Sequence, residues 1–208
     1  MKRPFLKLMA SVALLVSVAA PAIAQESPDA LIRRLSTEVF DRIRSDKDLQ
    51  AGDFKKLSDL VDATVMPHVN FQRMTALSVG RNWRSASPEQ QKQLMNEFRV
   101  LLLRTYSGAL SSVKDQSIRM KPLRADAADT EVIVRSEVAQ PRGEPIQLDY
   151  RMEKASDGWK IYDVNVLGVW LVETYRGQFA QEVGARGIDG LIKSLVDKNR
   201  SFEAPKKS

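Results

Sequence analysis

Few residues of this chain could do chemistry. The sequence contains no cysteine and a single histidine, His68. The lack of cysteine excludes thiol catalysis, thiolate-bound zinc and iron–sulfur clusters. A Ser-His-Asp triad would need His68 as its base, but His68 follows Pro67 beside a predicted helix start, where a capping or surface histidine is typical. No phosphate-binding glycine loop or nucleophile elbow is present, so the sequence offers little support for hydrolytic or metal chemistry.

Three carboxylates on predicted strands are the remaining catalytic candidates. Asp149 and Glu153 alternate with apolar residues, so we expect both to face solvent in surface ion pairs. Asp163, next to Tyr162, could enter a cavity as a general base, as in cone-shaped isomerases. No neighbouring residue provides a specific oxyanion partner. An enzyme that uses Asp163 therefore stays only as an alternative.

The elements that position these residues change type along the chain. Helical spacing of apolar residues predicts helices that begin near Ser27, Asp53, Asn70 and Ser87. Period-two alternation then predicts four strands, at 118–121, 131–138, 146–153 and 159–166. Helical spacing returns beyond Gly168. This order predicts an α+β fold, with helices packed on a curved four-stranded antiparallel sheet. Such a sheet looks like the cones of cystatin-like and NTF2-like proteins, which often enclose a cavity.

The N-terminus indicates where the protein works. Lys2, Arg3 and Lys7 precede an apolar run at 8–20, and Ala22-Ile23-Ala24 fits a cleavage site. This pattern predicts a cleaved signal peptide at 1–24, and the run is shorter than the roughly 20 residues of a membrane span. An uncleaved anchor is the alternative. We expect one domain at 25–199, outside the cytoplasm, followed by a disordered tail at 200–208.

Charge argues against a nucleic-acid partner. The chain carries a formal charge of +6, and segment 1–24 contains three basic residues and no acidic one, so the remainder carries about +3. No basic block accompanies a nucleic-acid-binding motif. We expect no cofactor and no resident metal.

Large apolar side chains are abundant on the predicted inward faces. They fit either an ordinary core or the wall of a cavity, because both have the same periodicity. The residues alone therefore predict an exported α+β binding domain. A periplasmic chaperone with an exposed apolar surface remains open at this point.

A set of short motifs narrows the choice by resemblance. Segments 65–71 (VMPHVNF) and 77–83 (LSVGRNW), together with 162–164 (YDV), 175–179 (YRGQF) and 187–192 (GIDGLI), resemble the periplasmic toluene-tolerance proteins. These are the phospholipid-binding MlaC proteins of the Mla system, which maintains lipid asymmetry of the outer membrane. The match covers nearly all of the chain after 24, in order. Trp170 departs from the family pattern, in which a small residue is expected after Gly168-Val169.

The resemblance implies a soluble, monomeric periplasmic carrier that does no chemistry on its cargo. Such proteins hold the acyl chains of a phospholipid inside the domain. They exchange it between an outer-membrane lipoprotein–porin complex and an inner-membrane ABC transporter with a ring of substrate-binding domains.

Inward spacing and the resemblance together predict the lipid-binding residues. A phosphate at the mouth could use Arg81, Arg104 or Arg176. The apolar wall is expected to comprise Phe71, Met74, Leu77, Trp83, Phe98, Leu101, Leu102, Tyr106, Leu148, Tyr150, Val164, Val166, Val169, Trp170, Tyr175 and Phe179.

Overall fold

The computed structural model describes residues 25–126 and 128–203. Six α-helices lie in these residues: α1 (Pro28–Ser45), α2 (Lys47–Gln50), α3 (Phe54–Thr64), α4 (Phe71–Val79), α5 (Pro88–Ser111) and α6 (Leu171–Ser201). Short 3-10 turns, η1 (Met66–His68) and η2 (Gly80–Ser85), flank α4. The signal peptide predicted at 1–24 lies outside the described residues.

The helix starts follow from capping residues. Ser87 accepts a hydrogen bond from the Gln90 amide, and the Gln90 side chain accepts one from the Ser87 amide, which forms a capping box for α5. Asp53 and Asn70 cap α3 and α4 in the same way with their side-chain oxygens. These bonds satisfy amides that have no partner inside the helix.

The sheet contains five strands rather than the four predicted. They are β1 (Ser117–Met120), β2 (Glu131–Ala139), β3 (Ile146–Ala155), β4 (Gly158–Val166) and β5 (Val169–Trp170), each antiparallel to the next in the order β1-β2-β3-β4-β5. The unpredicted β5 forms because Leu167 and Gly168 both adopt positive φ, 53° and 88°, in a two-residue turn. Val169 and Trp170 then pair with Val166 and Asn165.

A β-bulge changes which residues of β4 face the helices. Met152 pairs with Ile161, but Arg151 pairs with Asp163, so Tyr162 is the extra residue. Beyond the bulge, Val164 shares the inner, helix-facing side with Tyr150, whereas Asp163 lies on the outer face. One extra residue thus exchanges the two faces of the strand.

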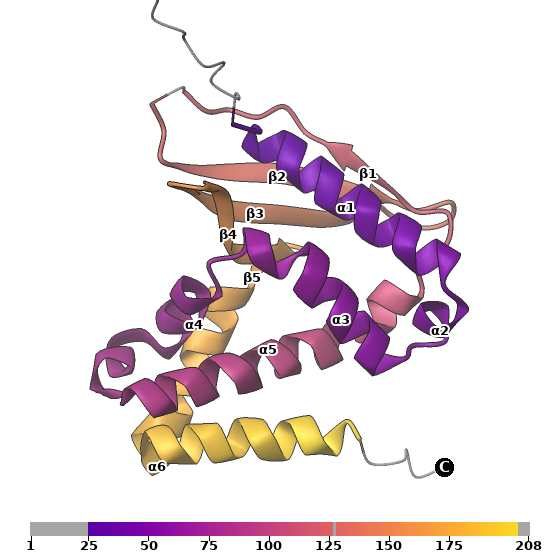
Figure 1. Ribbon diagram of the computed structural model, residues 1–208. Helices are drawn as coiled ribbons and strands as arrows, with labels where there is room; N and C mark the ends of the chain where they lie inside the picture. The colour runs from indigo at the N-terminus through magenta and orange to yellow at the C-terminus, as the bar shows by residue number, and fades with distance from the viewer. Residues whose placement is uncertain (1–24, 127, 204–208) are drawn as a thin grey trace, which may run out of the picture.

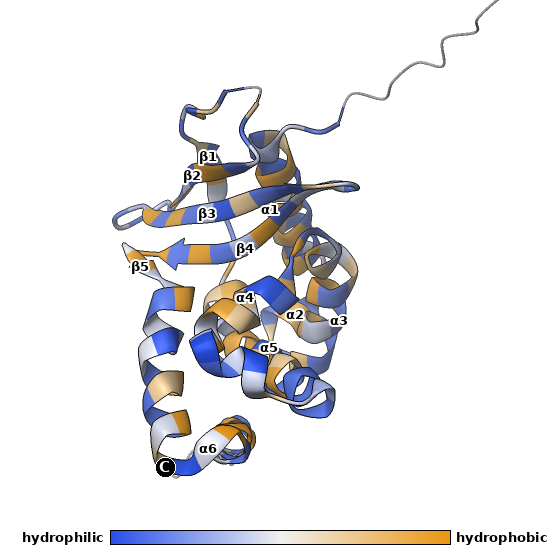
Figure 2. Ribbon diagram, turned by 90° about the vertical axis from the view of Figure 1, so that its left-hand side faces the viewer, coloured by the Kyte–Doolittle hydropathy of each residue, from blue (hydrophilic) through white to orange (hydrophobic). Residues whose placement is uncertain are grey.

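The helices form a layer on the inner face of the sheet (Figures 1 and 2). Helix α1 packs on β1 and β2, while α4 and α6 contact β4. Helices α5 and α6 run side by side, and α6 bends at Gly187, where φ is 70° and ψ is −175°. The bend folds the second half of α6 beneath α5, as Figure 1 shows.

Two apolar clusters fill the space between these layers. The "sheet cluster" joins α1 to the sheet and contains Leu31, Ile32, Leu35, Val132, Val134, Met152 and Ile161. The "helix cluster" joins α4, α5 and α6 and includes Met74, Phe98, Leu101, Val172, Tyr175, Phe179, Leu191 and Leu195. A third cluster ties α3 and α5 to the end of α1.

The C-terminal segment is ordered further than predicted. The disordered tail was expected from 200, yet α6 continues through Ser201, and Arg104 forms an ion pair with Glu203. Residues 204–208 of that tail lie outside the described part. Within residues 25–126 and 128–203, no helix has the length and apolar character needed to cross a bilayer.

Candidate functional site

The inner face of β3 and β4 carries apolar side chains that are not fully covered. Cross-strand register aligns Val134 with Tyr150 and Val164 in one row, and Ser136 with Leu148 and Val166 in the next. Val134 and Ser136 are buried, as expected beneath α1. The other four residues are only half-buried, although they point to the side where the helices lie. We call this strip of Leu148, Tyr150, Val164 and Val166 the apolar seam.

The seam runs along the junction of the two clusters. Val164 packs against both the sheet cluster and the helix cluster, and Val166 packs against the helix cluster. Leu102 and Tyr106 of α5 pack against the helix cluster too and are also only half-buried. An interior-facing apolar surface that stays accessible is typical of a ligand site rather than of a closed core.

Aromatic packing closes the region behind this junction. Phe98 is completely buried, and its ring centre lies 4.8 Å from that of Tyr175 and 5.2 Å from that of Phe179, both edge-on. Phe71 adds a tilted contact at 5.8 Å. Such edge-to-face pairs are a favourable arrangement for buried rings. Phe98 and Phe179 therefore belong to solid core that supports the seam.

Three tyrosine hydroxyls are the main polar groups near the seam. The Tyr150 hydroxyl lies beside Ser136 and Ser36, and burial raises the pKa of Tyr150 to about 12. Burial also raises the pKa of Tyr106 and of Tyr175, whose hydroxyl lies beside Thr105. The serine partners of Tyr150 were missed by sequence reasoning, since only the strand register and the docking of α1 bring them there.

The structure gathers most of the predicted lipid-binding residues. Tyr150 packs on the sheet cluster, whereas Leu148, Val169 and Trp170 lie in neither cluster. Val169 is 54% exposed, and Trp170 carries the Arg151 guanidinium 4.0 Å from its ring centre. The helix cluster and its margin hold Phe71, Met74, Leu77, Trp83, Phe98, Leu101, Leu102, Tyr106, Val164, Val166, Tyr175 and Phe179.

The three predicted headgroup arginines differ in their contacts. Arg104 lies 4.1 Å from the centre of the Phe54 ring and pairs with Glu203 at 2.5 Å. Arg176 donates to the carbonyl oxygen of Leu77 at the end of α4. Arg81 is exposed and has no ion pair within the described residues, so it is the one whose guanidinium is left for a ligand.

Asp163 is a structural residue and not a cavity base. It is 1% exposed on the outer face, and Oδ1 accepts hydrogen bonds from the amides of Val164 and Val172 at 2.9 and 3.0 Å. Its other oxygen accepts from Arg151 at 3.0 Å. Burial raises the pKa of Asp163, and the Val172 amide is the largest opposing influence. Because of the bulge at Tyr162, Asp163 lies on the outer face, away from the helices, and not in a cavity.

The expectation for Asp149 was also wrong. Asp149 is 6% exposed, and its Oδ2 accepts a hydrogen bond from the side-chain Nε2 of Gln147 at 2.7 Å. It lies between the cross-strand neighbours Arg135 and Asn165. Glu153 is half-buried and forms an ion pair with Arg73. The outer face is therefore covered around Asp149 and Asp163, on β3 and β4, whereas Glu131 and Arg135 of β2 are exposed. No cluster of three potential metal ligands occurs in the described parts of the chain.

The fold is thus α+β, with a strip of half-buried apolar side chains on the helix-facing side of its sheet. The family model described as MlaC protein matches residues 23–197, and the chain therefore belongs to the MlaC family. This membership confirms the sequence-based assignment and indicates a carrier rather than an enzyme.

Similar proteins carry matching descriptions. The intermembrane phospholipid transport system binding protein MlaC of Haemophilus influenzae is 26% identical over 177 residues, which cover 84% of this chain and 83% of that protein. The toluene tolerance protein ttg2D of Pseudomonas putida is 24% identical over 91% of this chain and 85% of its own length. A solved structure of a phospholipid-binding protein from Ralstonia solanacearum, in complex with a phospholipid, is 44% identical. It superposes with a TM-score of 0.82 over 85% of this chain and 98% of that one.

Proposed function

We propose that this protein is a periplasmic phospholipid carrier whose acyl-chain site lies between the apolar seam and α5. The observation that carries the proposal is the likeness to a structure solved with a phospholipid, at 44% identity and a TM-score of 0.82. The half-buried inner face supports it, because Leu148, Tyr150, Val164 and Val166 face the helices without being covered by them. Leu102 and Tyr106 form the opposite wall in this proposal.

A largely apolar site with few polar groups suits a carrier energetically. Each methylene group removed from water contributes about 0.8 kcal/mol, so two acyl chains with about 30 such groups would gain roughly 24 kcal/mol. Noncovalent affinity reaches a ceiling near 18–21 kcal/mol, so this gross figure is not a net binding energy. The relevant reference is the bilayer, where the chains are equally dry. A carrier need only match the membrane closely enough for its partners to reverse the transfer.

The exchange partners follow from the family. We infer that the protein accepts and delivers lipid between an outer-membrane lipoprotein–porin complex and an inner-membrane ABC transporter with a ring of substrate-binding domains, and that it works as a monomer. Arg81 is the headgroup candidate that we retain, since Arg104 and Arg176 are engaged within the protein. Val169, which pairs with Val166, remains a predicted contact at the end of the seam, whereas Trp170 pairs with Asn165 and carries Arg151 on the outer face.

Bulky substitutions test the site. The variants Leu102→Trp and Tyr150→Trp would fill the space between α5 and the sheet, so we expect co-purified phospholipid to fall at least about five-fold, as expected when an apolar site is occluded. The measurement is solvent extraction of the purified protein followed by lipid mass spectrometry. Phe54→Trp, a half-buried aromatic change in the third cluster, is the matched control and should keep wild-type occupancy.

Two results would contradict the proposal in different ways. Folded Leu102→Trp and Tyr150→Trp variants that retain wild-type lipid would show that the site lies elsewhere. A wild-type protein that carries no phospholipid, yet suppresses aggregation of other chains, would favour a chaperone over a carrier.

A further inference from the structure

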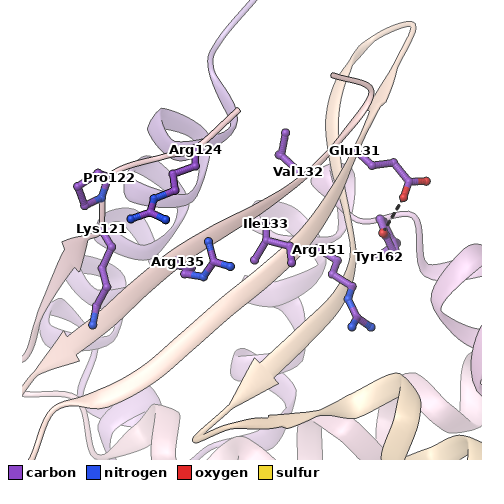
Figure 3. A pocket seen from close by; sticks show the side chains of 9 residues that line it. All are labelled: Lys121, Pro122, Arg124, Glu131, Val132, Ile133, Arg135, Arg151 and Tyr162. Atoms are coloured by element: carbon purple, nitrogen blue, oxygen red, sulfur yellow. Dashed lines mark hydrogen bonds between the residues drawn. The ribbon is translucent and has the colours of Figure 1, made fainter. Parts of the chain in front are cut away.

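The outer face of the sheet carries a groove that the proposed lipid site does not use. Figure 3 shows Lys121 and Arg124 along one side of it and Arg151 on the other, with Arg135 and half-buried Ile133 between them. The volume of this outer groove is about 750 Å³. Ile133 pairs with Arg151, which in turn pairs with Asp163, so this is the side of the sheet away from the seam.

At the outer groove, the backbone edge of β2 has no strand partner among residues 25–126 and 128–203. Strand β1 ends at Met120, opposite Ser136, and the Lys121 amide makes one more bond, to the Arg135 carbonyl oxygen, at 2.9 Å. The backbone polar groups of Arg135 therefore point toward β1. Those of Ile133 and Glu131 point the same way, because orientation repeats every second residue in an antiparallel strand. No described strand pairs with β2 there, and a free strand edge can accept another strand.

The groove also carries an excess of positive charge. Four cations and one carboxylate line it. Two of the cations are neutralised by ion pairs, Lys121 with Glu137 and Arg151 with Asp163, both at 3.0 Å. The carboxylate, Glu131, forms an ion pair with Arg73 at 2.7 Å. Arg124 and Arg135 are exposed and have no carboxylate partner among residues 25–126 and 128–203. Two guanidinium groups thus remain available on either side of the free edge.

We propose that the outer groove binds an extended, acidic segment of a partner protein, which adds as a strand to the free edge of β2. Main-chain bonds to Ile133 and Glu131 would provide affinity, as in other cases of strand addition. Carboxylates of the segment would meet Arg124 and Arg135, which favour planar, bidentate recognition of such groups. A concave groove beside free backbone groups suits an extended peptide better than a membrane surface, which cannot pair with a strand edge.

The first test measures affinity for a defined acidic peptide. Fluorescein-labelled Gly-Glu-Val-Glu-Thr-Glu-Val-Glu-Gly is titrated with the full-length protein, and polarisation is recorded at low and at physiological salt. We expect the double variant Arg124→Gln/Arg135→Gln to weaken binding about ten-fold, as lost charge pairing at an interface does. The matched control, Arg33→Gln/Arg42→Gln, removes two exposed α1 arginines and should weaken it less than about two-fold, through long-range charge alone. Equal losses in both variants would overturn the proposal.

The second test separates strand addition from loose charge attraction. The Ile133 amide points to the free edge, whereas the Val134 amide faces β3. In the free protein we expect the Ile133 amide to exchange with solvent much faster than that of Val134. Saturating peptide should slow hydrogen exchange of the Ile133 amide at least about ten-fold and leave that of the Val134 amide unchanged. Only the Ile133 amide gains a hydrogen-bond partner from the peptide.

Two further outcomes would overturn the proposal. One is peptide binding that leaves Ile133 exchange unaltered. The other is binding to vesicles of phosphatidylglycerol and phosphatidylcholine that depends on Arg124 and Arg135, with no binding of the acidic peptide. The second outcome would reassign the outer groove to the membrane surface.

Discussion

The two faces of the sheet hold their side chains in opposite ways. On the inner face, rows such as Tyr150 and Val164 are apolar and half-buried, and few hydrogen bonds fix them. On the outer face, Arg73 spans Glu131 and Glu153 and covers the Tyr162 ring at 3.7 Å. The outer face is thus held by many directional contacts, and the inner face depends mainly on packing, with the Tyr150 hydroxyl beside Ser136 and Ser36 as its polar contact.

A second set of contacts on the outer face, made by Arg151 and Asp163, explains how the inner face can remain open. Arg151 contacts Asp163, Glu173 and the Trp170 ring, so it fastens β4, β5 and the start of α6 together. Asp163 also holds the Val172 amide at the beginning of α6. The wall of the proposed lipid site is therefore positioned from the side that no lipid touches. A binding domain that must lose its ligand needs such support, because the ligand cannot be a permanent part of the core.

Removing Asp163 should break this arrangement most severely. Asp163→Ala leaves the Val164 and Val172 amides and the Arg151 guanidinium without their acceptor, so we expect the free energy of unfolding to fall by about 3 kcal/mol. Urea titration followed by circular dichroism measures the loss. Asp163→Asn keeps one acceptor oxygen and should lose only about half as much. A loss below about 1 kcal/mol in Asp163→Ala would show that the outer-face contacts do not support the inner face.

The second expected effect concerns the bend in α6. Tyr175 and Phe179 precede Gly187, and Leu191 and Leu195 follow it, yet all four pack in the helix cluster. A φ of 70° with a ψ of −175° suits only glycine, so Gly187→Ala should cost about 2 kcal/mol of unfolding free energy. No atom lies within 4 Å of the added Cβ, which makes the backbone the sole cause.

Gly184→Ala is the matched control for the bend. Gly184 lies in the same helix with an ordinary φ and has nothing within 4 Å of the added Cβ. Alanine there should stabilise the protein by about 0.5–1 kcal/mol. The same thermal or urea unfolding experiment compares the two variants. Similar changes at both positions would contradict a requirement for the bend.

The contrast between the faces also shows how much of the fold could be predicted from the sequence. Caps at Asp53, Asn70 and Ser87 and the period-two strands were correct, because they depend on local chemistry. The faces of β4 were not predictable, since nothing in the local sequence marks Tyr162 as a bulge. A position in a cavity therefore stayed open as an alternative for Asp163, which the bulge places on the outer face. The β5 pairing was missed because a positive φ at Leu167, a leucine, is unusual.

The candidate site likewise has features that the sequence predicts and features that depend on how distant elements pack. Helical and strand spacing brought twelve of the predicted wall residues to the helix cluster, but spacing alone cannot distinguish buried Phe98 from half-buried Tyr106. That distinction depends on how the two layers meet. Arg104 and Arg176 could not be judged either, because their partners Glu203 and Leu77 are distant in sequence.

The smallest expected effect isolates one polar group of the inner face. Tyr150→Phe removes a hydroxyl that lies beside Ser136 and Ser36, so at neutral pH we expect a loss of about 1 kcal/mol in the free energy of unfolding. The pKa of Tyr150 is about 12 in the folded state and about 10 in an unfolded chain. Between these values the unfolded protein binds fewer protons than the folded one, so the contribution of Tyr150 to stability declines as pH rises from about 10 to about 12.

Tyr150→Phe lacks this hydroxyl, so its stability does not include this decline as the pH rises. The stability advantage of wild type over Tyr150→Phe should therefore fall across this alkaline range and change sign by about pH 11.5, since all other titrating groups are common to both proteins. Urea titrations of the two proteins at pH 7, 10 and 11.5 measure it. A constant difference would mean that the Tyr150 hydroxyl is as accessible in the folded protein as in the unfolded chain. The seam would then be an open surface without the buried end that a site for acyl chains requires.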